Sequence, residues 1–350
     1  MIKLEQRLAS LPSTIYLLIA QIDELKGRWV GGANLSPQIL DRLQRSVLVT
    51  STGASTRIEG AKLSDKEVED LMRGLTMQKL SDRDAQEVRG YYEVLQLVFE
   101  NHAEMPLSES LILQLHTRLL SYSEKDERHK GRYKTLENKV EMRTKSGQVL
   151  EVLFDTTPPY LTPKAVQELV EQTNEALHKH ESHPLLVVAN FVVEFLKIHP
   201  FLDGNGRLSR VLTNLLLLRA GYVYVPYVSH EKLVEDNKTD YYIALRQSQV
   251  TFGGADETIA LWTAFFLKVL AEQAIRAVAL LSAEEIERTL SPMQLRVWNF
   301  LGTTTEATPG EIAATTGVAR PTVSQALSKL MKLKRVERLG LGRTTRYRKL

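Results

Sequence analysis

The sequence predicts a mainly α-helical protein with a β-hairpin near its middle and a small helix-turn-helix domain at its C-terminal end. Apolar residues recur at helical spacing through most of the 350 residues. Hairpin patterns, with short alternating runs on either side of a glycine-containing turn, occur around residues 140–154 and 336–348. A chain of this length can form two or three domains with a sizeable core.

The composition indicates a soluble globular protein, because 43% of the residues are hydrophobic and 25% are charged. The chain has no cysteine, which excludes disulfides, thiolate metal sites and cysteine nucleophiles. The sequence shows no secretory signal and no apolar run long enough to cross a bilayer. We therefore expect a cytoplasmic protein with no membrane partner.

The net charge of +3 hides an uneven distribution. Residues 320–350 hold ten basic side chains and one acidic side chain, Glu337, whereas residues 1–319 hold 35 basic and 41 acidic side chains. The basic character thus belongs to the C-terminal segment.

The N-terminal region reads as helices. Ser36 and Pro37 form a typical helix start, with an N-cap followed by proline at the first helical position. Residues 55–60, Ser-Thr-Arg-Ile-Glu-Gly, read as a helix end with Gly60 just beyond it. Glu59 is unfavourable at the negative end of a helix, so another group is expected to hold it. An ordinary surface carboxylate is the alternative. Further helices are expected over 64–71, 84–100 and 108–120.

Residues 140–143 and 149–154 read as two strands around a Lys-Ser-Gly-Gln turn. A two-stranded hairpin with an open edge is suited to adding an extended peptide as a further strand. A purely structural hairpin is the alternative. A helix over 163–178 follows.

The densest set of chemical groups lies in residues 199–210, His-Pro-Phe-Leu-Asp-Gly-Asn-Gly-Arg-Leu-Ser-Arg. Apolar helical patterns precede and follow it, which predicts a helix–loop–helix. The proline after His199 disfavours the α conformation at the histidine and ends the first helix. Gly204 and Gly206 allow positive φ, so backbone N–H groups can converge on an anion beside the start of the second helix.

Charged side chains in the same stretch predict phosphate chemistry. Arg207 and Arg210 lie three residues apart on one helix face, where both can bind phosphate oxygens. Asp203 is an oxygen ligand suited to Mg²⁺, and His199 is a base at the edge of the same pocket. A turn or a capped helix end explains each feature singly. Their combination favours phosphate-centred group transfer from a nucleotide.

Two segments follow this stretch. Residues 240–245 begin a helix on which Tyr241 and Leu245 share a face, a pattern more often found in a core than at a ligand site. Gln249 would continue that face one turn later. Residues 258–281 then predict one long helix that leads to the last domain, with Glu284 and Glu285 at the boundary.

Residues 290–350 predict three short helices followed by a basic hairpin, the pattern of a winged helix-turn-helix. The third helix, from Arg320, would read DNA, and Arg343 and Arg346 would lie on the wing. A docking or dimerisation module is the alternative, since such domains also serve those roles.

Residues 199–210 match the signature of Fic domains, His-Pro-Phe-x-Asp-Gly-Asn-Gly-Arg-x-x-Arg, at every fixed position. The chain therefore resembles Fic (Fido) proteins. Together with the patterns described above, the resemblance predicts four parts: a helical N-terminal region over 1–104, a Fic core over 105–255 with the hairpin as its flap, a linking helix over 256–283 and a winged helix domain over 284–350.

By resemblance, the chain is an adenylyltransferase that transfers AMP from ATP to a Ser, Thr or Tyr hydroxyl of a target protein, with release of pyrophosphate. His199 is then the catalytic base, which calls for a pKa near neutral, and Asp203 holds Mg²⁺. The N–H groups of Gly204, Asn205 and Gly206 bind the α- and β-phosphates.

The resemblance extends to the remaining phosphates and to the base of ATP. It assigns Arg207 to the β-phosphate and Arg210 to the γ-phosphate. Tyr241 and Leu245 would line the adenine pocket, with Gln249 one turn further along.

The resemblance also implies regulation. Ser55, Glu59 and Gly60 match the family's inhibitory motif, Ser/Thr-x-x-x-Glu-Gly. In the family the glutamate pairs with the second signature arginine, here Arg210. The paired arginine cannot hold the γ-phosphate, so ATP binds in an unproductive pose.

Alternative functions keep the same site. A Fic-like loop can use another phosphate donor, or remove AMP from a protein with Glu59 positioning water. In a further alternative, the chain is a DNA-binding regulator whose Fic core senses nucleotide. Self-modification and a homodimer formed through the N-terminal helices are additional hypotheses.

Overall fold

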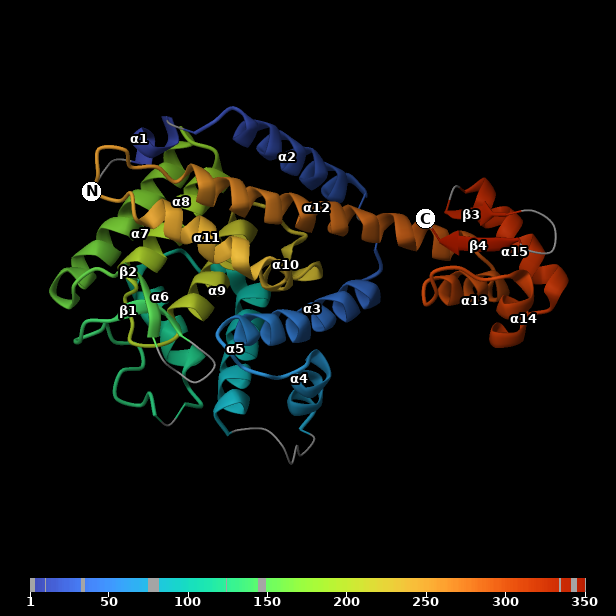
Figure 1. Ribbon diagram of the computed structural model, residues 1–350, viewed down its shortest axis with the longest axis horizontal. Helices are drawn as coiled ribbons and strands as arrows, with labels where there is room; N and C mark the ends of the chain where they lie inside the picture. Colours follow the sequence, from blue (N-terminus) through green and yellow to red (C-terminus); the bar gives the residue numbers. More distant parts are fainter. Residues whose placement is uncertain are drawn as a thin grey trace. The chain divides into compact units, whose positions relative to one another are not determined.

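The computed structural model describes residues 4–9, 11–32, 35–74, 82–123, 125–143, 149–333, 335–340 and 345–349. These residues are predominantly helical, with two separate two-stranded sheets, which confirms the mainly α fold class. The chain divides into two compact units, Met1–Val278 and Ala279–Leu350, whose elements are labelled in Figure 1. The finer division into four parts stays a prediction.

The first unit carries the helices and the hairpin expected before residue 278. Its helices are α1 (Leu4–Ala9), α2 (Thr14–Gly32), α3 (Pro37–Ile58), α4 (Asp65–Met72), α5 (Asp82–Asn101), α6 (Glu109–Leu119), α7 (Thr162–Lys179), α8 (Pro184–Ile198), α9 (Asn205–Arg219), α10 (His230–Asp236), α11 (Lys238–Gln249) and α12 (Ala260–Thr289), which continues into the second unit. The short 3₁₀ turns are η1 (His102–Glu104), η2 (Pro159–Leu161) and η3 (Val225–Tyr227), and the strands are β1 (Lys139–Arg143) and β2 (Val149–Asp155).

Helices α8 and α9 form the centre of the first unit (Figure 1). Every residue of α8 except Pro184 and Lys197 is buried, as expected for a helix that is apolar on all sides. Helix α9 packs against α3, α5, α6 and α8. The loop between α8 and α9 therefore stands on a rigid support.

Helix α3 begins as predicted. The Ser36 side chain accepts a hydrogen bond from the N–H of Ile39, and Pro37 occupies the first turn. The helix ends at Ile58 with Glu59 as its C-cap, and Gly60 has a φ of 106°, which glycine adopts without strain. The predicted helix end at 55–60 is therefore confirmed.

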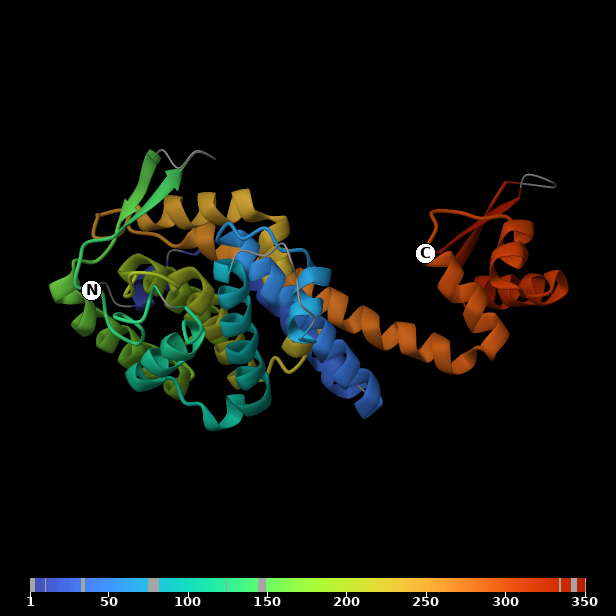
Figure 2. The same cartoon turned by 90° about the horizontal axis from the view of Figure 1, so that it is seen from below.

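Strands β1 and β2 pair antiparallel, with Lys139 opposite Asp155 and Arg143 opposite Val149. The register shifts twice along the pair, which increases the local twist. Figure 2 shows the hairpin projecting from the helical body, and β2 contacts α11. The turn residues 144–148 lie outside the described residues.

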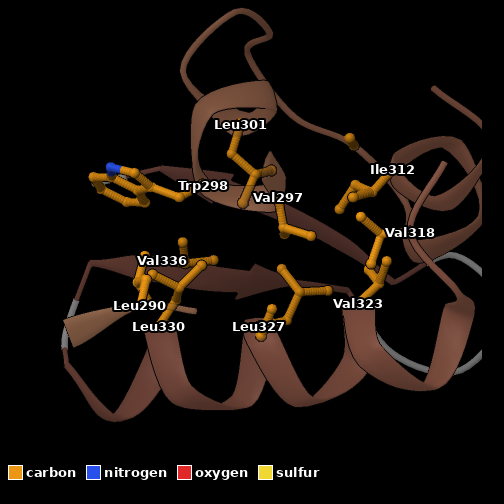
Figure 3. Packing of buried hydrophobic residues seen from close by; sticks show 12 residues of the cluster. Leu290, Val297, Trp298, Leu301, Ile312, Val318, Val323, Leu327, Leu330 and Val336 are labelled. Atoms are coloured by element: carbon orange, nitrogen blue, oxygen red, sulfur yellow. The ribbon is translucent and has the colours of Figure 1, made fainter. Parts of the chain in front are cut away.

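The second unit consists of α13 (Pro292–Leu301), α14 (Pro309–Thr316), α15 (Arg320–Lys332), β3 (Val336–Leu339) and β4 (Arg346–Lys349), in addition to the end of α12. Figure 3 shows its core, in which Val297 and Leu327 lie between Trp298 at one end and Ile312 at the other. Three helices followed by an antiparallel hairpin match the winged helix-turn-helix that the sequence predicts.

Arg343 and Arg346 are the two arginines that the sequence analysis places on the wing. Arg343 lies outside the described residues. Arg346 lies 3.4 Å from Glu306, so its charge is partly neutralised within the unit.

Two differences from the expected elements have a physical reason. Helix α12 runs to Thr289, beyond the expected end at Leu281, because residues 282–289 are mostly Ala, Glu and Arg, which favour helix. The sequence analysis did not anticipate α10, a short helix capped by the Ser229 side chain. A segment of seven residues carries too little periodicity to be recognised.

Across the described ranges, no helix combines the length and the hydrophobicity that a membrane crossing requires.

Candidate active site

A pocket of about 160 Å³ lies where the α8–α9 loop, the start of α9 and helix α11 meet. It is lined by His199 and Asp203 from the loop, Tyr241 and Leu245 from α11, and Glu59 from the end of α3. Three segments that are distant in the sequence thus contribute chemical groups to one small cavity.

The loop backbone ends α8 and starts α9 within a few residues. Helix α8 ends at Ile198, as the proline after His199 predicts, and His199 caps it in the left-handed conformation, with φ at 51°. Gly204 also has positive φ, at 81°, and α9 begins at the next residue. The side-chain amide of Asn205 donates to Phe201 O (2.7 Å) and accepts from Phe201 N (2.9 Å), which holds the loop closed.

Gly206 differs from the expectation. It lies in the first turn of α9 and has no positive φ. Its lack of a side chain matters for another reason, because a Cβ there would meet Glu59 Oε1 at 2.2 Å. Gly206 thus permits the close approach of Glu59 to the helix N-terminus, where N–H groups of the first turn are free of helical partners.

His199 is held in one tautomer. Its Nδ1 lies 3.2 Å from the carbonyl oxygen of Leu196, and since a carbonyl only accepts, Nδ1 must carry the proton. Nε2 is left with a lone pair. Burial lowers the pKa of His199 to about 4, below the near-neutral value that the sequence analysis called for. The ring is therefore neutral at pH 7 and able to accept a proton, although as a weak base.

Asp203 is held among cationic groups. Its Oδ1 accepts from Arg207 Nη2 (2.9 Å) and from the N–H of Gly204 (2.6 Å), and its Oδ2 accepts from Lys125 Nζ (3.0 Å). Burial alone would raise the pKa of Asp203, but Arg207 and Lys125 outweigh it and lower the pKa to about 2. The carboxylate is thus ionised at every relevant pH.

The carboxylate of Asp203 fits a magnesium ion that is also bound by phosphates, because Mg²⁺ commonly takes one or two protein carboxylates together with substrate oxygens. Across the described residues, no group of three or more His, Cys, Asp or Glu side chains could hold a metal by itself.

Arg207 and Arg210 are both buried, but they contact different partners. Arg207 lies against Asp203 and against Glu87 of α5, with Nη1 3.2 Å from Glu87 Oε2. Its buried Nε has no hydrogen-bond partner among the described residues. A buried guanidinium with an unused donor beside the pocket is suited to an anion.

Arg210 contacts the inhibitory segment predicted from the sequence. Its Nε donates to Ser55 Oγ (2.8 Å), and its Nη2 donates to Ser55 O (3.0 Å) and to Glu59 Oε1 (2.7 Å). Burial alone would lower the pKa of Arg210, but the Glu59 carboxylate outweighs it and raises the pKa. Glu59 lines the pocket and Arg210 does not, so the carboxylate lies between this arginine and the cavity.

Neighbouring residues that the sequence analysis did not single out fix the end of α3. Arg57 binds Glu235 of α10 through two nitrogens, with Nη2 3.0 Å from Oε2. Lys238 of α11 donates to Ile58 O at 2.6 Å, which satisfies a free carbonyl at the helix end. The backbone next to Glu59 is thus tied to two other helices.

His116 of α6 was also missed. Its ring stacks on Phe201 with centroids 3.7 Å apart. Nδ1 accepts from the N–H of Gly131 (2.9 Å), so Nε2 carries the proton and donates to Asp203 O (3.0 Å). Burial lowers the pKa of His116 to about 4, consistent with a neutral ring. On sequence alone, one histidine on the apolar face of an amphipathic helix gives no signal beyond ordinary core packing.

Helix α11 supplies the remaining wall. Tyr241 and Leu245 line the pocket, and so does Tyr242, which the sequence analysis did not select. Gln249 is absent from the lining and instead donates to Val193 O at 3.1 Å. One turn further along α11, the face that Tyr241 and Leu245 share is therefore packed in the protein core and no longer lines the pocket.

Comparison with known families agrees with this geometry. Residues 106–217 match the model of the Fic/DOC family, and residues 288–344 match the model of the MarR family. The chain is therefore a Fic-domain protein that also carries a MarR-type winged helix domain.

Curated relatives match over shorter stretches. The chain is 39% identical over 66 residues to a Fido domain-containing protein of Dictyostelium discoideum, covering 19% of this chain and 46% of that protein. It is 32% identical over 143 residues to the protein adenylyltransferase Fic of Nematostella vectensis, covering 39% of this chain and 29% of the relative. It is 46% identical over 57 residues to the protein adenylyltransferase Fic of Drosophila ananassae, covering 16% of this chain and 12% of the relative. These matches span less than half of each relative.

Solved structures share the fold. A Fic family protein from Desulfovibrio desulfuricans matches over 97% of each chain with a TM-score of 0.62 at 24% identity. A Fic domain containing signaling protein from Bacteroides thetaiotaomicron matches over 75% of this chain and 95% of its own, with a TM-score of 0.61 at 27% identity.

Proposed function

We propose that this chain is a protein adenylyltransferase that transfers AMP from ATP to a Ser, Thr or Tyr hydroxyl of a target protein. One observation carries the proposal. A histidine with a free Nε2 lone pair lines the same pocket as the N-terminus of a buried helix and an ionised aspartate. This arrangement combines a proton acceptor with a phosphate cradle.

In the proposed reaction, the target hydroxyl oxygen attacks the α-phosphorus of ATP. The bond between the α-phosphorus and the oxygen that bridges to the β-phosphate breaks, and pyrophosphate leaves. The hydroxyl proton passes to Nε2 of His199. The N–H groups of Gly204, Asn205 and Gly206 would stabilise the charge on the phosphate oxygens. The N–H of Gly204 would have to leave Asp203 Oδ1 to do so.

Cationic groups would neutralise the rest of the triphosphate. Arg207 would bind the β-phosphate, using its unpartnered Nε. Asp203 would hold Mg²⁺, which when bound neutralises phosphate charge. Lys125 would then give up its contact with Asp203 Oδ2. Tyr241 and Leu245 would contact the adenine, since they line the same pocket as the loop.

We further propose that Glu59 inhibits this reaction. An arginine held by Glu59 is not available to the γ-phosphate, so ATP would bind with its α-phosphate misplaced for transfer. The direct contact between Glu59 and Arg210 favours this interpretation. Release of the carboxylate would free the guanidinium for ATP.

Labelled ATP tests the reaction type on the Glu59→Gly variant. Protein-bound label from the α-phosphate, but not from the γ-phosphate, is expected for AMP transfer, with the chain itself as the first acceptor to examine. Label from the γ-phosphate would instead indicate a phosphotransferase. Release of AMP from a previously modified protein would indicate the AMP-removing alternative.

DNA binding by the second unit is a second candidate function. Helix α15 exposes Arg320, Ser324 and Gln325 near its start, where side chains of a recognition helix meet base edges. The match to the MarR family supports this candidate. A salt-dependent gel shift with duplex DNA, lost in the Arg320→Ala variant, is the expected result. Equal shifts for both proteins at every salt concentration would contradict it.

A further inference from the structure

A buried lysine lies between the hairpin and the catalytic loop. The side chain of Lys134 is almost fully buried, with the whole residue 2% exposed. Its Nζ donates to Asn138 Oδ1 (2.8 Å), to Thr156 Oγ1 (2.8 Å) and to Ile198 O (3.0 Å). An ammonium group has three donors, and each of them meets a neutral oxygen here. Burial lowers the pKa of Lys134 to about 8, so the group is still mostly charged at pH 7.

Two of these partners are the residues that flank the hairpin. Asn138 directly precedes β1, and Thr156 directly follows β2. Thr156 Oγ1 lies 2.8 Å from Asn138 O, so the two stems are also joined to each other. Lys134 therefore closes the base of the hairpin.

The remaining contacts lead to the residues around His199. Four consecutive carbonyl groups, from Ile198 to Phe201, accept hydrogen bonds from Lys134 or Asn138. Lys134 Nζ donates to Ile198 O, and the backbone N–H of Lys134 donates to Pro200 O (2.9 Å). The side-chain Nδ2 of Asn138 donates to Phe201 O (2.8 Å) and, over a longer distance, to His199 O (3.4 Å).

These carbonyls lie at the C-terminal end of α8, where backbone acceptors lack helical partners and a positive charge is favourable. The same turn holds His199 in its left-handed conformation. The groups that join the two ends of the hairpin therefore also contact the turn that carries the candidate base.

We propose that Lys134 is a positioning residue that fixes the hairpin stems to the turn bearing His199, so that an acceptor hydroxyl presented by the hairpin is aligned with Nε2. The proposal rests on the proposed adenylyl transfer. Because Lys134 does not line the nucleotide pocket, its loss should affect transfer far more than ATP binding.

The test uses the full chain with Glu59→Gly as the parent. Lys134→Met removes the charge and the donors but keeps the length, and Lys134→Arg keeps the charge and the donors. The matched control is Lys164→Met, since Lys164 is exposed on α7 and its contact is a 3.7 Å ion pair with Glu168. The measurements are the dissociation constant for Mg·ATP and the initial rate of incorporation of α-labelled AMP into the chain.

For Lys134→Met we expect a transfer rate at least tenfold below the parent and a dissociation constant within about twofold of it. Lys134→Arg should recover most of the rate, and Lys164→Met should match the parent. A transfer rate for Lys134→Met equal to that of Lys164→Met would overturn the proposal. So would a loss of ATP affinity as large as the loss of rate. If Lys134→Met does not fold, Thr156→Val removes one hydrogen-bond partner of Lys134 and should also lower the transfer rate.

A second readout separates this inference from the proposed function. The chain has no cysteine, so spin labels can be attached at Glu141→Cys in β1 and Gln167→Cys in α7 without competing thiols. The distance distribution between the labels should broaden in Lys134→Met and stay narrow in Lys134→Arg. An unchanged distribution in Lys134→Met would overturn the anchoring role. If the Glu59→Gly parent transfers no AMP, the proposed function fails, yet the distance measurement still decides the role of Lys134.

Discussion

Glu59 Oε1 accepts a hydrogen bond from Arg210 Nη2 at 2.7 Å, although the two residues are 151 positions apart in the chain. The arginine side chain is 3% exposed and the glutamate side chain 33%. A buried guanidinium needs an anionic partner, and in this structure a carboxylate of the same chain supplies it. An incoming phosphate would compete for the same donor, so in the proposed reaction this ion pair would link ATP binding to the position of α3.

Replacing Glu59 should raise activity. In Glu59→Gly the guanidinium of Arg210 is free to bind the γ-phosphate, and we expect at least a tenfold higher rate of AMP incorporation. Glu59→Gln keeps the size without the charge and should give an intermediate rate. Incorporation from α-labelled ATP measures the effect. An unchanged rate in Glu59→Gly would remove the inhibitory role.

Loosening the end of α3 should relieve inhibition in part. Arg57 ties this end to Glu235, and its Nη1 also donates to Leu63 O at 2.8 Å. Arg57→Gln should therefore allow Glu59 to leave Arg210 more often and raise the transfer rate several-fold. The double variant with Glu59→Gly is the control. If Arg57→Gln raised the rate of Glu59→Gly by the same factor, its effect would not operate through Glu59.

The pH profile should report the burial of His199. The reaction needs the neutral imidazole, and the pKa of His199 is lowered from 6.5 to about 4. The neutral form therefore predominates down to about pH 5, and activity should fall only as the pH approaches 4. Because kcat/KM reports the free enzyme, its acid limb in Glu59→Gly should bend near pH 4. A bend near pH 6.5 would contradict this prediction.

Removing the polar atoms of His116 should disturb the loop. His116→Phe can keep the stacking on Phe201, but it leaves Asp203 O and Gly131 N without their partner. Each lost bond costs on the order of 1–3 kcal/mol when the remaining group stays buried. We expect a lower urea midpoint for the first unit together with weaker Mg·ATP binding, because the start of α9 would shift. An unchanged ATP affinity would show that His116 does not position the loop.

Acid should destabilise the first unit through its buried histidines. The pKa values of His116, His199 and His230 are each lowered to about 4, mainly by burial. The unfolded chain therefore binds more protons than the folded chain between pH 4 and 6.5, so stability falls as the pH drops through that window. Urea unfolding at pH 7, 6 and 5 measures this. A midpoint that does not change from pH 7 to pH 5 would contradict it.

The sequence was informative where function depends on neighbouring residues. The His-Pro pair predicts the end of α8 and the glycines predict a loop that leads into a helix carrying Arg207 and Arg210; both occur, with positive φ at Gly204 but not at Gly206. Ser36 and Pro37 likewise mark the start of α3 through local hydrogen bonding. Such features need no information about distant parts of the chain.

Residues that act through long-range contacts could not be found in this way. Lys134 lies in a segment without helical or strand pattern, and its role depends on carbonyl groups more than sixty residues away. Arg57 and Lys238 read as ordinary surface charges until α3, α10 and α11 are packed together. The sequence suggested that Gly206 is a glycine because it adopts positive φ. The structure shows instead that a side chain at this position would collide with Glu59.

The most direct test compares the initial rates of α-labelled AMP incorporation for the wild-type chain, Glu59→Gly and the double variant Glu59→Gly/His199→Ala. The account predicts a low rate for the wild type, a rate at least tenfold higher for Glu59→Gly, and no incorporation for the double variant, which should still bind ATP. Equal incorporation by Glu59→Gly and the double variant would contradict the central claim that His199 is the base of an adenylyl transfer restrained by Glu59.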